Sequence, residues 1–353
     1  MPQAPSVQMP AKNATIHDVA ILSGYSIGTV SAVINRKETV SKGTRRKVLQ
    51  AISDLQYRPS AAARRRLQPT MEKSIGLIVK EINNPYFADI ISGSQEAARE
   101  LGYNVLVAHT DRSYEFEQQV AELLVAKDVD GLIINPLLSE ESDLSHLFEI
   151  RRNNIPLVLI EGVRGMQAST VDVDNVAAEK EAVDYLIGLG HERIGHFAGP
   201  RYSQHSEERV EGVRRAHSAH RLAIGDEDIV YAGSSLEDGY NTARDYFEGR
   251  DREDCPSAVT CYNDLVAIGV LRALRELGLR VPEDVSVIGF DDIEVVSYLA
   301  VPLTTVRIPR YEIGQRATRL LIETAEAEDP SPTQKVMLDA DLVVRDSTAA
   351  PTR

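Results

Sequence analysis

The sequence predicts a multidomain chain in which a small all-α head precedes a larger α/β core of two lobes with parallel sheets. Three observations lead to this prediction. The chain of 353 residues is too long for one ordinary core. Helix start and stop signals crowd into residues 14–58. From residue 74 onward, apolar strand-like runs alternate with amphipathic helical stretches.

Charge divides the chain at the same place. Residues 1–70 contain 11 Lys and Arg against 3 Asp and Glu, a net charge of +8, whereas the remainder carries −22. The whole chain, at −14, argues against nucleic acid, but the head alone attracts phosphates and the acidic body repels them. This distribution indicates a nucleic-acid-binding module attached to a sensor.

Several classes of protein are disfavoured. No apolar run approaches the roughly 20 residues of a membrane span. No apolar run precedes a small-residue cleavage site at the N-terminus, so we expect a cytoplasmic protein. Cys255 and Cys261 fit no metal-ligand pattern and are interpreted as reduced thiols, with no metal or cofactor expected. No P-loop, G-x-S-x-G, histidine metal pair or Cys/His dyad pattern occurs, so we do not expect an enzyme.

The head is expected to begin with a disordered tail over residues 1–13, followed by three helices. Thr15 and Asp18 predict a capping box, and Gly24 ends the first helix. Ser26 and Ser41 cap the second and third helices. Their apolar residues are Ile16, Val19, Ala20 and Leu22 on one face of the first helix, Ile27, Val30, Val33 and Ile34 in the second, and Val48, Leu49, Ile52 and Leu55 facing inward in the third.

Two helices joined by a tight Gly-containing turn form a helix-turn-helix, whose second helix can enter the major groove with its N-terminus first. The strings TIHDVA, SIGTVSAVIN, VSKGTRRKV and YRPSAAAR follow one another within some fifty residues without a gap. They closely resemble the head of the LacI/GalR repressors. The resemblance implies a DNA-binding domain over residues 14–58.

The same resemblance implies which side chains meet DNA. Thr15, Ser26, Thr29, Ser31 and Asn35 would touch phosphates or bases. Ile27, Gly28 and Ala32 stand where this family reads bases. A buried core position is the alternative for Ile27, and simple clearance between helix and groove is the alternative for Gly28 and Ala32.

Residues 59–73 resemble the hinge helix and linker of the family, which orders on operator DNA and wedges a leucine into the minor groove. The resemblance implies DNA contacts by Ser60, Ala63, Arg64, Arg66 and Leu67. The match departs at the wedge, where Arg66 stands and Leu67 follows one residue late. Either Leu67 inserts after a register shift, or the arginines do more of the groove binding. A solvated basic linker is the third interpretation.

The core contains strand-like runs that are apolar throughout, which predicts parallel sheets covered by helices. The runs are 74–79, 103–108, 131–135, 156–162, 193–199, 257–264 and 285–292. Helical stretches include 87–101, 117–126 and 177–189. We expect an N-terminal lobe over 74–174 with about 306–333, and a C-terminal lobe over 175–305 with about 334–347. Ligands bind beyond the strand C-termini, so two facing lobes predict a cleft there.

The core also resembles this family, through NNPYFADI, VDG, DNVAA, LGHERIGHFAGP, ERVEGV, YNDLVAIG, LGLRVPEDVSVIGFDD and PLTTV in family order. The resemblance implies a periplasmic-binding-protein-like fold and an effector site formed by Tyr86, Phe87, Asp174, His205, Arg209, Asn263 and Asp291. These groups suit a polyol, because carboxylates accept hydroxyl hydrogens, Arg and Asn donate, and an aromatic ring covers an apolar face.

Some of these residues could instead have a purely structural role. Arg209 could form a plain ion pair between lobes, and His205 could lie on the surface. Asp264 is expected to cap the helix that starts at Leu265, and Asp292 to end a strand. Gly162 and Ser234 replace larger residues of relatives, which favours a roomier pocket, for example for a disaccharide, unless Tyr86, Tyr202, Tyr262 and Phe290 fill the space.

Together these features predict a transcriptional repressor whose affinity for an inverted-repeat operator is set by a small molecule, most simply a sugar, bound between the lobes. A regulator controlled by a phosphocarrier protein and a sugar-binding protein without a regulatory role are the alternatives. The segment STAAPTR has no apolar heptad, which favours a homodimer over a tetramer. The effector, the sign of its effect and the operator sequence are left open.

Overall fold

The computed structural model describes residues 14–34, 37, 39–55, 57, 73–138, 143–250, 255–327 and 332–352. These residues form a helical head and an α/β core of two lobes, which confirms the predicted fold class. The expected tail over 1–13 and Asn35 lie outside the described residues, and so do residues 59–72 of the hinge and linker.

The head consists of α1 (Ile16–Ser23), α2 (Ile27–Ile34) and α3 (Lys42–Asp54). Thr15 and Asp18 form the predicted capping box, and Gly24 ends α1 in the left-handed conformation at φ 74°. The side chains of Ser26 and Ser41 accept hydrogen bonds from the backbone N–H groups of Thr29 and Thr44, 3.2 Å away in each case. All three predicted helix starts are therefore confirmed.

The core of the head is made by Val19, Val30, Val33, Val48 and Ala51. Two apolar expectations were wrong. Leu49 is 50% exposed, and Ala51 takes the inward position because α3 turns its 48/51/52 face toward α1. Leu22 is 53% exposed because the last turn of α1 extends beyond this small core.

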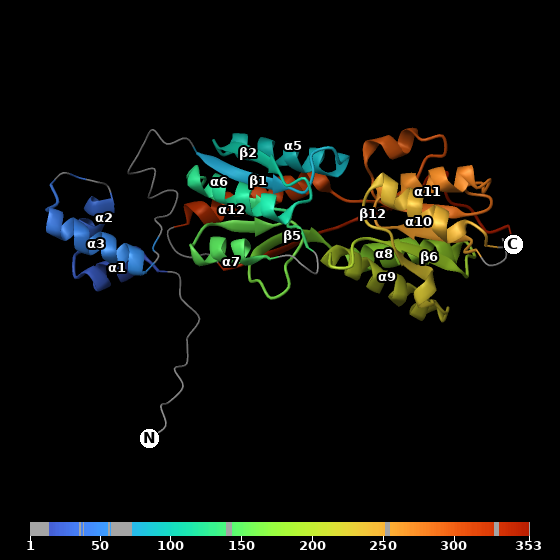
Figure 1. The fold of residues 1–353 in the computed structure, drawn as a ribbon, viewed down its shortest axis with the longest axis horizontal. Helices are drawn as coiled ribbons and strands as arrows, with labels where there is room; N and C mark the ends of the chain where they lie inside the picture. The colour runs from blue at the N-terminus through green and yellow to red at the C-terminus, as the bar shows by residue number, and fades with distance from the viewer. Residues whose placement is uncertain are drawn as a thin grey trace, which may run out of the picture.

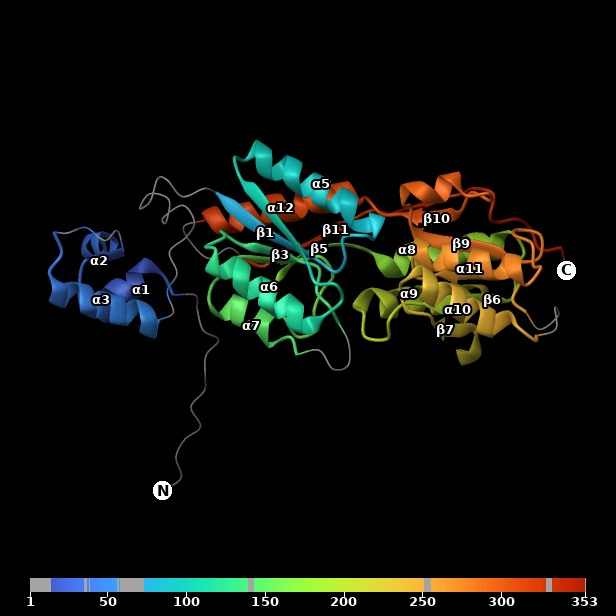
Figure 2. The same ribbon diagram turned by 45° about the horizontal axis from the view of Figure 1, so that its top comes forward.

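The N-terminal lobe contains a six-stranded parallel sheet in the order β11-β5-β4-β3-β1-β2 (Figure 1). Its strands are β1 (Ser74–Val79), β2 (Asn104–His109), β3 (Leu132–Ile134), β4 (Leu157–Leu159), β5 (Ser169–Val173) and β11 (Lys335–Leu338). Its helices are α5 (Pro85–Glu100), α6 (Tyr114–Ala126), α7 (Ser145–Arg152) and α12 (Arg310–Glu326). Figure 2 shows α5 and α12 on one face of the sheet, with α6 and α7 on the other.

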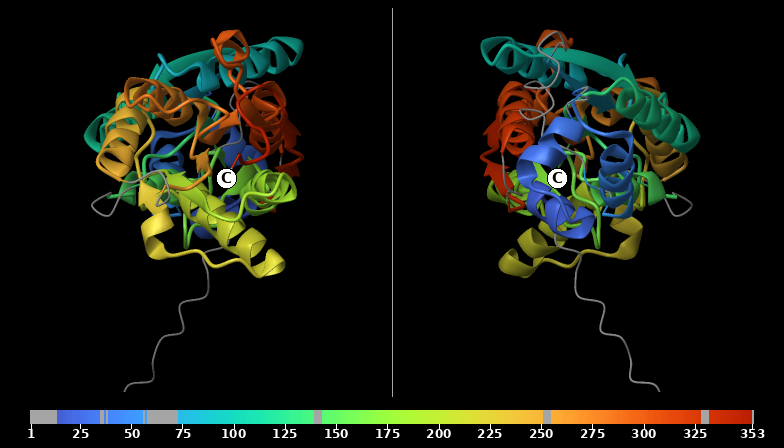
Figure 3. Two further views of the ribbon diagram at one scale, coloured as in Figure 1. Left: turned by 90° about the vertical axis from the view of Figure 1, so that its right-hand side faces the viewer. Right: turned by 90° about the vertical axis from the view of Figure 1, so that its left-hand side faces the viewer.

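The C-terminal lobe repeats this plan, with the strand order β12-β10-β9-β8-β6-β7. Its strands are β6 (Ile194–Ala198), β7 (Ile229–Tyr231), β8 (Ala258–Cys261), β9 (Ser286–Asp291), β10 (Thr304–Arg307) and the antiparallel β12 (Asp341–Val343). Its helices are the paired α8 (Asn175–Gly188) and α9 (Gln204–His220), the paired α10 (Leu236–Phe247) and α11 (Asp264–Glu276), and the short 3-10 helices η1 (Asp226–Asp228) and η2 (Glu294–Tyr298). The end-on views show helices around the outside of the core (Figure 3), and the C-terminal end of the chain lies at the end of the C-terminal lobe that is farther from the N-terminal lobe (Figure 1).

Three segments of the chain join the lobes, and one corrects a predicted boundary. The crossings lie between β5 and α8, between β10 and α12, and between β11 and β12. The sequence pattern predicts that residues 334–347 all belong to the C-terminal lobe. However, β11 pairs in parallel with β5 of the N-terminal lobe, and only β12 pairs with β10. The chain changes lobe within the two residues 339–340, a step too short to leave a composition signal.

Each lobe has apolar residues on both faces of its sheet, as buried parallel strands require. Within the described ranges no single helix is long and apolar enough to cross a membrane, although α1 and α2 together, bent by 103°, meet a criterion of length and composition.

Candidate functional site

The head presents one face of α2 to the outside. Val30 and Val33 are buried, whereas Ser26, Ile27 and Gly28 are exposed. Ile27 is 39% exposed, so it is not the buried core residue of the alternative interpretation. Among the described residues a Cβ at Gly28 would meet only the Ser26 hydroxyl, at 3.8 Å, so none of them requires a glycine there.

Thr29, Ser31 and Ala32 on the same helix are half-exposed. Thr15 uses its hydroxyl in the capping box, where it donates to Asp18 at 2.8 Å. Ser26, Ile27, Gly28 and Thr29 therefore lie at the start of α2, whereas Ser31 and Ala32 lie about one turn further along it and Thr15 caps α1. The start of such a helix is the end that enters a groove first. Ser60, Ala63, Arg64, Arg66 and Leu67 lie outside the described residues.

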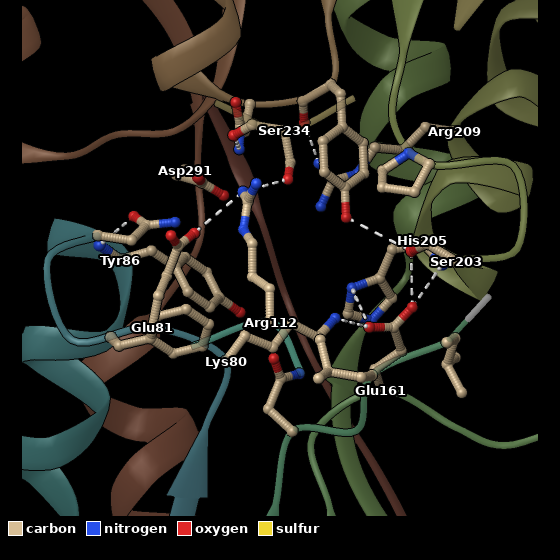
Figure 4. Close-up of a pocket in the computed structure, with 18 of the residues that line it drawn as sticks. Lys80, Glu81, Tyr86, Arg112, Glu161, Ser203, His205, Arg209, Ser234 and Asp291 are labelled. Carbon is tan, nitrogen blue, oxygen red and sulfur yellow. Dashed lines mark hydrogen bonds and ion pairs between the residues drawn. The ribbon is translucent and has the colours of Figure 1, made fainter. Parts of the chain in front are cut away.

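A cavity of about 240 Å³ lies in the core between the two lobes. The residues that follow the C-terminal ends of the strands line it. Lys80 follows β1, Glu161 follows β4, Asn263 follows β8, and Asp291 is the last residue of β9. The cavity thus occupies the place that the parallel sheets predict. Its other lining residues are Glu81, Asn84, Tyr86, Phe87, Arg112, Tyr114, Asn135, Leu137, Leu138, Pro200, Ser203, His205, Arg209, Ser234 and Tyr262 (Figure 4).

Asp291 and Arg209 supply the main charges on the C-terminal side of this cavity. Asp291 is buried and has a positive φ of 125°, which turns the end of β9 toward the cavity. Burial raises the pKa of Asp291 to about 7, although Arg209, Arg310 and His205 act to lower it. A carboxyl of this kind is a strong acceptor for hydroxyl donors, because a hydrogen-bonded ligand replaces the missing water.

Arg209 is held on α9 by packing and hydrogen bonds. Its guanidinium lies 3.5 Å from the Phe290 ring centroid, and its Nε donates to Asn175 at 3.1 Å. Another of its nitrogens donates to the backbone carbonyl of Tyr262. Its partners lie within the C-terminal lobe, so the alternative of an interlobe ion pair is wrong.

A buried network of charged and polar groups forms the cavity wall nearest the N-terminal lobe (Figure 4). Glu161 is fully buried, and its carboxylate accepts from Lys80 Nζ and from Ser203 Oγ, each at 2.6 Å. Burial alone would raise the pKa of Glu161, but Lys80 and His205 lower it to about 2. His205 Nε2 lies 2.9 Å from Asp172 Oδ2.

The same network decides the state of His205. It is 8% exposed, so the alternative of a surface histidine is wrong. Burial lowers the pKa of His205, but the charges of Asp172 and Glu161 raise it above its ordinary value. Lys80 and His205 thus each lie against a carboxylate, Lys80 against Glu161 and His205 against Asp172.

Arg112 reaches across the cavity from the loop after β2. Its guanidinium donates to Ser234 Oγ of the C-terminal lobe at 2.7 Å and to Glu81 Oε1 at 3.2 Å (Figure 4). The backbone has positive φ at Asp111 and Arg112, 48° and 58°. Arg112 therefore occupies part of the space that the small side chain of Ser234 was expected to leave open.

Six of the seven predicted effector residues surround the cavity, and Asp174 does not. Asp174 is exposed and caps α8 by accepting from the N–H of Ala177 at 2.9 Å. Asp172, within β5, is the nearby carboxylate that meets a cavity residue, because its Oδ2 lies 2.9 Å from His205 Nε2. Asp174 was therefore wrong as a lining residue.

The expectation that Gly162 leaves extra room also needs correction. A Cβ at Gly162 would meet the Gln204 side chain at 2.9 Å, so Gln204 fills that space. Tyr86 and Tyr262 line the cavity, whereas Tyr202 is exposed and Phe290 lies behind Arg209.

Two lesser assignments are settled as well. Asn263 caps α11 through its Oδ1, which accepts from the N–H of Val266 at 2.8 Å, so the predicted cap at Asp264 was wrong. Asp264 instead lies buried, accepting from Thr305 and from the N–H of Ile293. Asp292 accepts from Arg307 and Arg345 beyond the end of β9.

Sequence reasoning missed the residues that follow the strands of the N-terminal lobe, namely Lys80, Glu81, Arg112, Asn135 and Glu161. The signal was available, since each comes within three residues of a strand C-terminus. Among the described residues no cluster of His, Cys, Asp or Glu is placed to hold a metal ion.

Comparison with known proteins gives consistent results along the chain. Residues 15–60 match the family model "Bacterial regulatory proteins, lacI family", and residues 183–348 match "Periplasmic binding protein-like domain". The HTH-type transcriptional repressor PurR of Photobacterium profundum is 33% identical over 339 residues, 95% of this chain and 98% of that protein. The HTH-type transcriptional repressor CytR of Escherichia coli is 32% identical, covering 96% of this chain and 97% of that one.

The chain is also similar to solved structures of transcriptional regulators. A complex of the transcriptional regulator CelR with cellobiose is 31% identical and has a TM-score of 0.72, covering 95% of this chain and 99% of that chain. The lac repressor dimer bound to operator and the anti-inducer ONPF is 27% identical, with a TM-score of 0.70, covering 96% of this chain and 100% of that chain.

Proposed function

The chain belongs to the lacI family of bacterial regulatory proteins, and on that premise we propose that it is a repressor whose affinity for an operator is set by a sugar bound in the interlobe cavity. The observation that supports the effector most strongly is the placing of Asp291 and Arg209 at one cavity. There a buried carboxyl and a fixed guanidinium face the same space as Tyr86 and Phe87.

A neutral polyol suits this cavity better than an anion. Lys80 is paired with Glu161, His205 with Asp172, and Arg112 with Glu81. An anionic ligand would have to compete with these carboxylates and would also face Asp291. A sugar instead offers hydroxyl donors to Asp291 and acceptors to Arg209, and the rings of Tyr86 and Phe87 can cover an apolar sugar face. The relative bound to cellobiose favours the same class.

The proposed DNA contact runs through α2. Ile27, Gly28 and Ala32 lack the donors needed for bidentate contacts to guanine or adenine. We propose that Ile27 and Ala32 read thymine methyl groups, and that Ser26 and Thr29 contact phosphates. The rest of the specificity then comes from the shape of the site.

We propose a homodimer that binds an inverted repeat. The lac repressor relative is a dimer on its operator. β2 is one of the two edge strands of its sheet, and Leu106 on it is 40% exposed, with Leu101 nearby in sequence 37% exposed. Sedimentation of the full chain at micromolar concentration tests this, and a monomer at every concentration would contradict it.

A thermal-shift screen of the full chain tests the effector class. Neutral mono- and disaccharides, sugar phosphates and purines are compared at equal concentration. A ligand present at about 100 times its Kd adds about 2.7 kcal/mol of stability, which is readily seen as a raised midpoint. We expect a shift with a neutral sugar and none with that sugar in the Asp291→Ala variant. A shift with purines alone would replace the sugar with a purine effector.

A further inference from the structure

The first turn of α9, in the C-terminal lobe, is bonded directly to the N-terminal lobe. Glu161 accepts from Ser203 Oγ at 2.6 Å and from the backbone N–H of His205 at 3.4 Å. Asp172 faces His205 at 2.9 Å. Ser203 and His205 thus bind two carboxylates that come from the ends of β4 and β5. We call Glu161, Asp172, Ser203 and His205 the α9 latch.

The α9 latch is buried and its charges are balanced. All four residues are less than one-tenth exposed. Lys80 lies 2.6 Å from Glu161 and neutralises it from within the N-terminal lobe. A charged hydrogen bond in such surroundings is stronger than one on the surface, and breaking it leaves a buried charge unpaired. The contact therefore resists opening of the lobes.

Two further contacts join the lobes, one beside the latch and one at the other end of the cavity. Gln204, also in the first turn of α9, fits against Gly162, where a Cβ would approach its side chain to 2.9 Å. At the other end of the cavity Arg112 donates to Ser234 across the lobes at 2.7 Å. Side chains of the protein thus connect the two lobes at both ends of the cavity. In a cleft that closes around a ligand, the bound ligand makes such connections.

We propose that the α9 latch holds the lobes closed with no effector bound, that the closed arrangement is the one that binds the operator, and that the effector therefore acts as an inducer. The second half of this inference rests on the proposed function. A ligand shifts an equilibrium only through its different affinities for the two states. If about 90% of the protein is already closed, a ligand that prefers the closed state raises operator affinity by about 10% at most. Only a ligand that binds more tightly to a different interlobe angle can then change the operator affinity substantially.

The position of the latch gives a ligand a way to favour a different interlobe angle. Lys80, Glu161, Ser203 and His205 all line the cavity. A ligand that hydrogen-bonds to any of them draws on donors and acceptors that now join the lobes.

Backbone hydrogen exchange in the full, effector-free chain tests the latch itself. His205 is the second residue of α9, and the first N–H groups of a helix have no acceptor within it. Glu161 is the acceptor of the His205 N–H, so the exchange of that N–H reports closure. The double variant Lys80→Met with Glu161→Met removes the acceptor and leaves no unpaired charge buried. We expect exchange at residue 205 to become about 10- to 100-fold faster, as for loss of a hydrogen bond to a charged group.

Two other variants complete the experiment. Asp172→Asn keeps the shape of its site and should speed exchange at His205 by a smaller factor, which keeps the test available if the double variant does not fold. Glu149→Gln, in an exposed ion pair on α7, is the control and should change nothing. If residue 205 exchanges as fast in the wild type as in the latch variants, the latch does not form and the inference is overturned.

Operator affinity tests the second half. DNA sites are selected from random duplexes with dialysed full chain, and affinity is measured with no small molecule present. We expect tight, sequence-specific binding, weakened in the latch variants and unchanged in Glu149→Gln. Specific binding that appears only after a sugar is added would overturn the inducer assignment. A chain that binds no sequence with or without the sugar would refute the proposed repressor, while the exchange result would still decide on the latch.

Discussion

Asparagine in place of Asp291 tests whether this carboxyl is the ligand-ready acceptor of the cavity. Burial raises its pKa from 3.8 to about 7, so the folded protein holds the Asp291 proton more tightly than the unfolded chain. Such a group stabilises the fold below its unfolded pKa, and this stability is lost as pH rises through the folded value. The wild type should therefore lose stability between about pH 4 and pH 7.

The size of the loss follows from the shift. Three pKa units correspond to roughly 4 kcal/mol, an upper figure because the surroundings relax. Asn cannot titrate, has the same shape, and tolerates the positive φ of this position about as well as Asp. The charge of Asp291 also contributes to the raised pKa of Asp264, after burial, so the variant removes part of that second titration as well.

Urea unfolding of both proteins, followed by circular dichroism from pH 4 to pH 8.5, provides the assay. We expect the midpoints to lie closest together at pH 4, and the wild type to fall progressively below Asp291→Asn as the pH rises through 7. Parallel pH dependence of the two proteins would show that Asp291 is solvated or already paired, and the reasoning about the cavity would fail.

Three further predictions concern the head, the cavity and the lobe core. Operator binding should weaken steeply with salt, because phosphate contacts release counterions. Ile27→Ala should cost about 1–2 kcal/mol of operator-binding free energy at sites with thymine opposite residue 27 and little at other sites. A uniform loss over all sequences would contradict thymine readout. Arg209→Ala should abolish the thermal shift given by the effector while the protein still folds, and an unchanged shift would remove Arg209 from the site. Gly93→Ala should lower the free energy of unfolding by about 1–3 kcal/mol, because its Cβ would approach the Tyr311 carbonyl to 2.1 Å where α5 crosses α12. Gly188→Ala in α8 is the control and should not destabilise the protein, because no described atom lies within 4 Å of its Cβ. Equal urea-unfolding midpoints for the two variants would contradict the tight crossing.

The sequence could predict elements with strong local signals. Thr15, Asp18 and Gly24 fix the bounds of α1 through hydrogen bonds within one turn, so a single short segment contains all the information. The long apolar strands β1, β6 and β9 lie within two residues of their predicted bounds for the same reason. The short strands β5, β7 and β10 were not predicted individually, because three to five residues give too little pattern.

The site was only partly predictable, because its geometry depends on contacts between distant segments. Asp172 and Asp174 look alike in sequence, and only the end of β5 at Val173 decides which one meets His205. The space beside Gly162 is filled by Gln204, which comes from the other lobe. Leu49 looked like a core residue until the rotation of α3 against α1 was known. These errors concern where single side chains lie, whereas the wrong lobe assignment of residues 334–347 concerns a strand whose pairing partner is distant in sequence.

Operator affinity measured with and without the sugar found in the thermal-shift screen tests the central claim most directly. The full-length wild type is compared with Arg209→Ala on the same selected operator. We expect the sugar to change the wild-type affinity by about 5- to 150-fold, the usual range of coupling between two sites, and to leave Arg209→Ala unchanged. An operator affinity that ignores the sugar in the wild type, or that shifts equally in both proteins, would contradict control of the head by this cavity.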